Sequence, residues 1–212
     1  MRLLLIRHAQ SSANAERRLQ GHLDVPLSER GLRESALLAE RLAQQAIDVL
    51  YTSPLQRARQ TAEVVAARLG LDLVERPALI ERDVGELAGL TRDEIMERYP
   101  HYVPQRLDTR PEIDVPGFEN DAEFRQRVLA VLHEIIERHT EGTVAVVTHG
   151  GVIGAFCRET LQMPPNRPAP FAIGNTSVSS FDVRDGGFDE SFRPRIQLIA
   201  LNDTCHLDAL RD

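Results

Sequence analysis

Short apolar segments alternate with longer amphipathic segments along most of this chain. The apolar runs predict buried strands at residues 3–6, 49–52, 71–75, 144–148, 178–183 and 195–200. The last two strands are expected to flank a turn at Asp185, Gly186 and Gly187, because glycine tolerates the backbone conformations of tight turns. The intervening segments have the periodicity of helices.

Capping residues indicate where these helices begin. Ser28 is a good N-cap for a helix that reaches about residue 46, and Ser53 followed by Pro54 predicts the start of another that ends at Gly70. A third helix is expected over residues 121–139. On the first helix the spacing predicts a core-facing stripe of Leu32, Ala36, Ala39 and Ala43. On the third helix the spacing predicts a core-facing stripe of Phe124, Val128, Val131, Leu132 and Ile135.

This alternation predicts an α/β fold, a three-layer α/β/α sandwich with a mostly parallel central sheet. The alternation of strands and helices is interrupted over about residues 81–120, which contain four prolines and one predicted short helix near residues 91–99. We interpret that stretch as an insertion over the active site. The length of 212 residues suits one domain, so residues 1–212 are expected to form a single unit.

Composition narrows the chemistry. The net charge of −7 and the pI near 5.5 argue against a nucleic-acid partner. All 25 basic residues are arginine, so any phosphate must be held by arginine, histidine or backbone N–H groups. No segment is apolar for long enough to span a membrane, and Arg7 interrupts the first apolar run too early for a signal peptide. We therefore expect a cytoplasmic protein without membrane contact, whose Cys157 and Cys205 stay reduced.

Two histidines follow predicted strands. Arg7 and His8 come directly after the first strand, and His149 and Gly150 after the strand at 144–148. Ligands of open parallel sheets bind at the carboxyl ends of strands, where an arginine holds an anion and a histidine can attack it. A nucleophilic His8 needs its other ring nitrogen held as a donor, which we expect a backbone carbonyl of the following turn to do. No His/Cys cluster surrounds either histidine, so no metal is expected.

Five motifs in order, RHAQSSAN, QGHLDVPLSERG, SPLQRARQTAE, ERDVGELAG and THGG, resemble the histidine phosphatase superfamily, the phosphoglycerate-mutase-like fold. Within it the chain looks like the branch of small broad-specificity phosphatases. The resemblance implies a phosphomonoester hydrolase that needs neither metal nor cofactor and forms a phosphohistidine on His8. It further implies an anion clamp of Arg7 and Arg57, stabilisation of the phosphoryl group by His149, and Glu81 as proton donor.

Other positions are less distinctive. Asn14, Gln20 and Gly21 match family positions that contact phosphate or substrate, and Gly150 lets the backbone approach a phosphate. Asp83 is an alternative to Glu81 as the acid. The segment at residues 175–177 and the tail at residues 202–207 are assigned structural roles. His206 of this tail is expected to form hydrogen bonds rather than to act in catalysis. Ala9 stands where the family usually has glycine, and we expect the backbone to tolerate it.

Three functions stay open at this stage. A phosphatase is favoured because the stretch at 81–120 contains few basic residues, interleaved with acids, whereas bisphosphate-dependent mutases carry a longer basic insertion. A phosphoglycerate mutase is the main alternative, and a phosphate-binding module without turnover is a third. The expected partner is a small phosphorylated metabolite, with sugar phosphates, phosphoglycerate and α-ribazole phosphate all open. A homodimer is neither indicated nor excluded.

Overall fold

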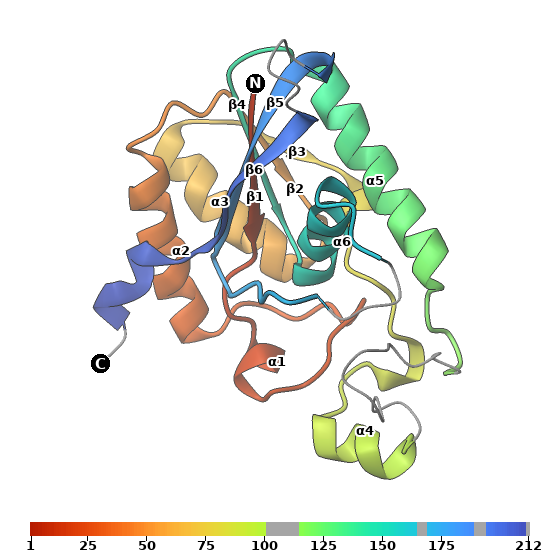
Figure 1. Ribbon diagram of the computed structural model, residues 1–212. Helices are drawn as coiled ribbons and strands as arrows, with labels where there is room; N and C mark the ends of the chain where they lie inside the picture. The colour runs from red at the N-terminus through yellow and green to blue at the C-terminus, as the bar shows by residue number, and fades with distance from the viewer. Residues whose placement is uncertain (101–114, 165–168, 189–193, 211–212) are drawn as a thin grey trace.

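The computed structural model describes residues 1–100, 115–164, 169–188 and 194–210, without the side chains of residues 185–188 and 194. Within these residues six strands form one sheet in the order β3-β2-β4-β1-β5-β6 (Figure 1). The first four in this order are parallel, and β5 and β6 are antiparallel to their neighbours. The strands are β1 Arg2–Arg7, β2 Val49–Thr52, β3 Leu73–Glu75, β4 Thr143–Thr148, β5 Val178–Phe188 and β6 Pro194–Asp203. The predicted α/β class and mostly parallel sheet are confirmed.

Helices cover both faces of the sheet (Figure 1). Within the described residues the α-helices are α1 Ser12–Ala15, α2 Glu29–Leu42, α3 Gln56–Leu69, α4 Arg92–Arg98, α5 Asp121–Arg138 and α6 Gly150–Thr160. Short 3₁₀ turns lie at Pro77–Leu79, Gly85–Leu87 and Cys205–Leu210. Helices α2 and α3 pack on one face and α5 and α6 on the other, which gives the predicted three layers. Part of the predicted insertion at 81–120, residues 101–114, lies outside the described residues.

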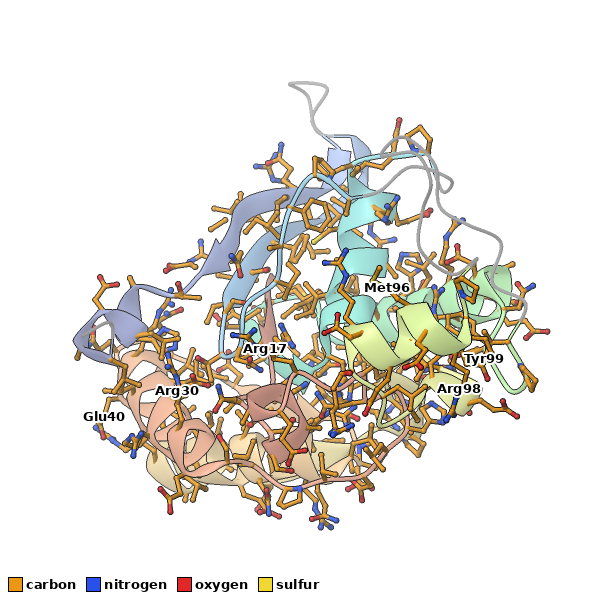
Figure 2. All side chains as sticks on the ribbon, turned by 90° about the horizontal axis from the view of Figure 1, so that it is seen from below. Arg17, Arg30, Glu40, Met96, Arg98 and Tyr99 are labelled. Carbon is orange, nitrogen blue, oxygen red and sulfur yellow. The ribbon has the colours of Figure 1, made fainter. Side chains whose placement is uncertain are left out.

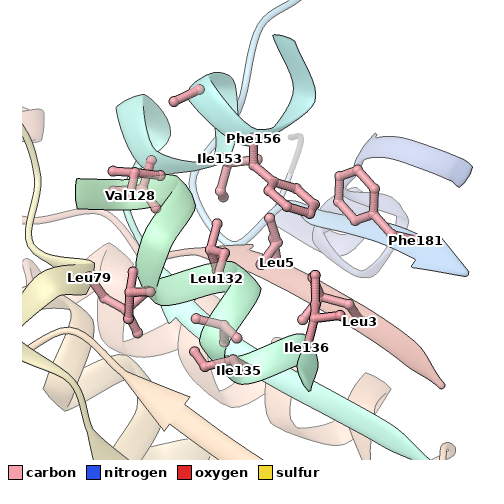
Figure 3. Close-up of a cluster of buried hydrophobic side chains, with 14 of the residues drawn as sticks. Leu3, Leu5, Leu79, Val128, Leu132, Ile135, Ile136, Ile153, Phe156 and Phe181 are labelled. Atoms are coloured by element: carbon pink, nitrogen blue, oxygen red, sulfur yellow. The ribbon is translucent and has the colours of Figure 1, made fainter. Parts of the chain in front are cut away.

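Strand β1 is buried on both faces, as a central parallel strand requires. Its side chains alternate, so that Leu3 and Leu5 enter the core under α5 and α6, while Leu4 and Ile6 enter the core under α2 and α3. Figure 3 shows the first of these cores, in which Leu5 lies among side chains of α5 and α6 such as Leu132, Ile153 and Phe156. All five residues of the stripe predicted on α5 are buried.

The predicted stripe on α2 is largely wrong. Leu32 is 53% exposed, and the buried face holds Glu34, Leu38 and Leu42. The reason is that the loop after β1 packs on this helix. The Glu34 Oε2 atom accepts a hydrogen bond of 2.9 Å from the Gln10 backbone N–H, so a buried carboxylate takes a position that hydrophobicity assigns to solvent.

Three predicted boundaries also differ. Helix α2 ends at Leu42 and not near residue 46. Helix α3 begins at Gln56 after an N-cap at Leu55, and not at Ser53 and Pro54, although the Ser53 hydroxyl lies 3.4 Å from the Leu55 N–H as well as contacting another part of the fold described below. The predicted turn at residues 185–187 is wrong, since β5 continues through Phe188. The register of the pairing between β5 and β6 shifts between Val183 and Phe188, so Gly186 and Gly187 lie in an irregular part of the strand pairing. None of the described helices is long and apolar enough to cross a bilayer.

Gly31 tests the contact between α2 and the loop after β1. A Cβ atom at this position would lie 2.0 Å from the Gln10 carbonyl oxygen, which is part of the backbone and cannot swing away. We expect Gly31→Ala to lower the free energy of unfolding by about 1–3 kcal/mol. Gly154→Ala is the matched control, because Gly154 is also helical and has nothing within 4 Å of the added atom. The control should be neutral or stabilising by up to about 1 kcal/mol. Urea denaturation measures both, and equal losses would contradict the packing argument.

Candidate active site

The pairing of β1 with β4 brings the two predicted histidines together. Arg7 is opposite Thr148 in the parallel register, and the next backbone N–H, that of His8, donates to the Thr148 carbonyl at 2.8 Å. His8 and His149 therefore leave the sheet at the same carboxyl edge. Their ring centroids lie 5.2 Å apart with the planes tilted by 59°. The sequence-based expectation that these segments meet is confirmed.

The His8 ring has one nitrogen free for chemistry. Its Nδ1 lies 2.7 Å from the Ala9 carbonyl oxygen, and a carbonyl can only accept, so Nδ1 carries the proton. The Nε2 lone pair is then available, as a nucleophile requires. Burial, together with the charges of Arg7 and Arg57, lowers the pKa of His8 well below 6.5. The imidazole is thus neutral at neutral pH.

His149 is fully buried behind His8 and is not among the residues that line the cleft. Its Nε2 lies 2.8 Å from the Ser53 hydroxyl, while Nδ1 is buried with no hydrogen-bond partner. Burial and the charge of Arg57 lower the pKa of His149 well below 6.5 as well. A buried nitrogen without a partner is rare in folded proteins and marks a place where a ligand can supply the missing contact.

Arg57 and Arg7 are held by neutral oxygens. Arg57 is 1% exposed and donates to the carbonyls of Gly21 and Leu23, at 2.8 Å each. Arg7 donates to the Ile173 carbonyl at 2.5 Å. Both Nε atoms are buried without a partner. Burial lowers the pKa of Arg57 to about 10, so it stays charged at neutral pH. Among the described residues neither arginine forms an ion pair, and this leaves two positive charges for an anion.

Glu81 lies at the start of α6. Its Oε2 accepts from the Gly151 N–H and its Oε1 from the Arg82 N–H, each at 2.9 Å. A Cβ atom on Gly151 would lie 2.2 Å from Oε1, so a side chain there would displace the Glu81 carboxylate. The alternative acid, Asp83, turns away from the cleft. Its carboxylate accepts from the Gly85 N–H and lies 3.4 Å from the His22 ring.

The predicted substrate-binding residues also border this site. Asn14, Gln20, Gly21 and Gly150 all line one open cleft of about 1040 Å³, together with Arg7, His8, Arg57 and Glu81. The Ser11 hydroxyl donates to the side-chain carbonyl of Gln20 at 2.7 Å, and the Ser11 N–H to Asn14 Oδ1 at 3.2 Å. Gly21 has a φ of +51°, where a side chain would also strike Val84. The polar contacts orient the amides at the cleft wall.

The outer cleft contains further arginines that the sequence analysis did not single out. Arg82 lies 2.6 Å from Asp121, with its guanidinium 4.4 Å from the centre of the Phe124 ring. Arg125 pairs with Glu159 at 3.6 Å. Arg18 pairs with two glutamates, at 2.9 and 3.0 Å. These positive charges are compensated, unlike those of the two inner arginines.

Helix α4 packs beside the segment that follows α1. The Leu19 N–H donates to the Leu90 carbonyl, and Arg18 contacts Glu94 of α4. Figure 2, seen from this end of the molecule, labels Arg17 of the first segment and Met96 of α4. In the described part of the chain no group of three or more His, Cys, Asp and Glu residues could hold a metal ion.

Sequence reasoning missed the contacts that hold the histidines in place, although it had assigned the segment at residues 175–177 a structural role. The Ser53 hydroxyl bonds His149, although Ser53 was expected to cap a helix. Thr61 of α3 accepts from the Ala9 N–H at 3.0 Å, and Ala9 does not have a positive φ, which confirms that the backbone tolerates alanine. Asn175 donates to the His8 carbonyl at 2.9 Å. Each of these contacts joins segments distant in sequence, so no local pattern signals it.

A cleft lined by Arg7, His8 and Arg57, with the His149 ring 5.2 Å from that of His8, at the carboxyl edge of a parallel sheet defines a site for phosphate chemistry. The chain matches the histidine phosphatase superfamily (branch 1) over residues 3–192 and therefore belongs to this family. It is 33% identical over 207 residues to Phosphoserine phosphatase 1 of Hydrogenobacter thermophilus, covering 98% of this chain and 94% of that relative.

Two other similarities extend the comparison. Phosphoglycerate mutase-like protein 4 of Arabidopsis thaliana is 35% identical over 187 residues, which cover 87% of this chain and 80% of the plant protein. Among solved structures, that of Bacillus stearothermophilus YhfR superposes with a TM-score of 0.82 at 29% identity, covering 98% of this chain and 99% of the other. The relatives thus include proteins named as phosphatases and as mutase-like proteins.

The two buried histidines predict how stability depends on pH. Because burial lowers both pKa values below 6.5, the unfolded chain binds protons below that pH that the native site does not bind. The free energy of unfolding should therefore fall as the pH falls below 6.5, by up to about 1.4 kcal/mol per pH unit for each histidine. The slope from these two histidines fades as the pH rises above 6.5 and is nearly gone by about pH 8, where the unfolded chain no longer binds the protons.

His8→Gln isolates one of the two contributions. Denaturation of both proteins at pH 8 measures the effect of the substitution on packing. Between about pH 5 and 6 the wild type should then lose stability more steeply than the variant, by up to about 1.4 kcal/mol per pH unit. Parallel curves from pH 5 to pH 8 would show that His8 is not held neutral by its surroundings.

Proposed function

We propose that the protein is a phosphomonoester hydrolase that needs no metal and acts through a phosphohistidine on His8. The observation that carries the proposal is the His8 ring. Its Nδ1 is bound to the Ala9 carbonyl, so that Nε2 is left free near Arg7 and Arg57, neither of which forms an ion pair with any described residue. A neutral imidazole with a fixed tautomer is a competent nucleophile. The adjacent positive charges bind the phosphate and stabilise the charge on its equatorial oxygens.

In the first step the substrate phosphate binds between Arg7 and Arg57, near the N-terminus of α6, whose dipole favours an anion. His8 Nε2 attacks the phosphorus, the bond from phosphorus to the ester oxygen breaks, and the carboxylic acid of Glu81 gives that oxygen its proton. His149 does not line the cleft, so we propose that it stabilises the phosphoryl group in transfer once the bound phosphate reaches its buried Nδ1, which has no hydrogen-bond partner among the described residues.

In the second step water releases the phosphate. Glu81, now a carboxylate, takes a proton from a water molecule that attacks the phosphorus, and the bond from phosphorus to His8 Nε2 breaks. Inorganic phosphate leaves and the enzyme returns to its starting state. Asn14, Gln20, Gly21 and Gly150 would contact the phosphate and the bound alcohol, because all four line the same cleft.

The substrate we propose is a small phosphorylated metabolite, in line with the name of the phosphoserine phosphatase relative. A phosphoglycerate mutase is the second candidate, favoured by the name of the plant relative. A mutase must hold a second anionic group of its substrate. The outer arginines Arg18, Arg82 and Arg125 are already paired with carboxylates, and this favours the hydrolase.

One experiment tests the reaction and its intermediate together. Purified protein should release phosphate from p-nitrophenyl phosphate and from phosphoserine in the presence of EDTA, and it should isomerise 3-phosphoglycerate far more slowly. Rapid quenching with ³²P-labelled substrate should trap an acid-labile phosphoryl group. His8→Ala should trap none and lose activity by at least about 10³-fold, since a covalent route loses its nucleophile. Efficient isomerisation with negligible hydrolysis would instead establish the mutase.

Glu81→Gln tests the proton donor. Loss of the acid matters most when the leaving alkoxide is basic, so kcat/KM for phosphoserine should fall by about 10²- to 10⁴-fold. For p-nitrophenyl phosphate, whose leaving group needs little protonation, the loss should stay below about 10-fold. Asp83→Asn is the matched control and should change either value by less than about threefold, since Asp83 is turned out of the cleft. Equal losses on both substrates in Glu81→Gln would remove Glu81 as the acid.

A further inference from the structure

The segment at residues 173–177 contacts both residues proposed to act on the phosphate. The Ile173 carbonyl accepts from Arg7 at 2.5 Å, and the Asn175 side chain donates to the His8 carbonyl at 2.9 Å. The Thr176 N–H lies 3.4 Å from the same His8 carbonyl. The conformation of this short segment therefore affects where the His8 backbone lies.

The tail of the chain holds this segment in turn. Asn202 Oδ1 accepts from the Gly174 N–H at 2.6 Å, and His206 Nε2 lies 3.1 Å from the Thr176 hydroxyl. Thr176 is buried and has a φ of +51°, a conformation that costs a β-branched residue free energy and persists only where its surroundings enforce it. The His206 contact is one of the interactions that enforce it.

The donors and acceptors can be assigned along the whole chain of contacts. Arg41 on α2 lies 3.1 Å from His206 Nδ1 and can only donate, so Nδ1 accepts and the ring proton is on Nε2. That proton is donated to Thr176 Oγ1, which leaves the hydroxyl proton free to be donated to the Asn175 carbonyl at 2.9 Å. The Asn175 amide then donates to the His8 carbonyl.

The neutral form of His206 is the form that this arrangement needs. Burial and the charge of Arg41 lower the pKa of His206 to about 4, although Asp203 and Asp208 act in the opposite direction. Arg41 is itself fixed, because it pairs with the Asp203 side chain and donates to the Asp203 carbonyl at 3.1 Å. The direction of each hydrogen bond in the series from Arg41 through His206, Thr176 and Asn175 to His8 is thus fixed.

Resting on the proposed function, we infer that His206 is a positioning residue for the nucleophile: it fixes the Thr176 backbone, and through Asn175 the carbonyl of His8. His206 does not line the cleft and has no contact with the reacting atoms. Its effect on the reaction is therefore expected in the rate of phosphoryl transfer rather than in the binding of phosphate. A displacement of the nucleophile by a fraction of an ångström is enough to slow attack.

Two substitutions of His206 test the hydrogen bonds of its two ring nitrogens separately. Glutamine has the same number of bonds from Cα to Nε2 as histidine, so His206→Gln keeps a donor for Thr176. Asparagine reaches only the position of Nδ1, so His206→Asn keeps an acceptor for Arg41 and loses the donor. We expect His206→Asn to lower the single-turnover rate of His8 phosphorylation by about 10- to 100-fold with KM changed less than about threefold. His206→Gln should stay within about threefold of the wild type.

A double-mutant cycle distinguishes positioning from a general loss of stability. In the Asn175→Ala background the shorter of the two hydrogen bonds to the His8 carbonyl is lost and only the 3.4 Å contact of the Thr176 N–H remains, so adding His206→Asn should lower the rate by a much smaller factor than it does in the wild type. Additive losses in kcat, or equal rates for wild type and His206→Asn, would overturn the inference. Thermal unfolding of each variant gives the folded fraction by which rates are corrected.

A readout that needs no turnover keeps this inference separate from the proposed function. In protein labelled with ¹⁵N-histidine, with the His8 signals assigned by their absence from His8→Gln, the His8 ring shifts should move in His206→Asn and remain in place in His206→Gln. Unmoved shifts in both variants would refute the positioning role even in an active enzyme. Moved shifts in a protein without hydrolase activity would support positioning and refute the proposed reaction.

Discussion

The parallel pairing of β1 with β4 is the constraint on which the rest of this molecule depends. It sets Arg7 opposite Thr148, so that both histidines emerge from the sheet at the same edge, with 5.2 Å between their ring centroids. Parallel neighbours need a crossover between them, and here the long connection contains α2, β2 and α3. The elements that bury the sheet are therefore also the elements that supply Ser53, Arg57 and Thr61 to the site.

The electrostatics of the site follow from where the arginines are buried. Removing a guanidinium from water is costly unless hydrogen bonds replace the lost hydration, and carbonyl oxygens do this for Arg57 without cancelling its charge. The uncancelled charge then acts on its neighbours. Burial and the two arginines together lower the pKa of His8, so the same charges that attract a phosphate also keep the nearby imidazole neutral. In the proposed mechanism, anion binding and a neutral nucleophile therefore have one physical origin.

Much of the fold and the centre of the site were predictable, because both depend on local patterns. Apolar runs marked the strands, and the position of His8 directly after one of them predicted its place at the sheet edge and its bond to a following carbonyl, which the Ala9 contact confirms. The buried face of α2 was not predictable, because Glu34 is buried by its bond to the Gln10 backbone. Ser53 was likewise assigned to a helix cap, since its contact with His149 joins distant segments.

The residues that sequence reasoning missed share a chemistry that explains their use. The His8 backbone is held from three directions, by the Thr148 carbonyl on β4, by Thr61 of α3 through Ala9, and by Asn175. Apart from the carbonyl, these partners are short polar side chains, which have few rotamers and lose little entropy when they are fixed. An imidazole is a modest nucleophile that cannot be made more reactive by a lower pKa alone, so its rate depends on the geometry of attack. In the proposed mechanism, neutral hydrogen bonds would fix that geometry without adding charge that competes with the phosphate for Arg7 and Arg57.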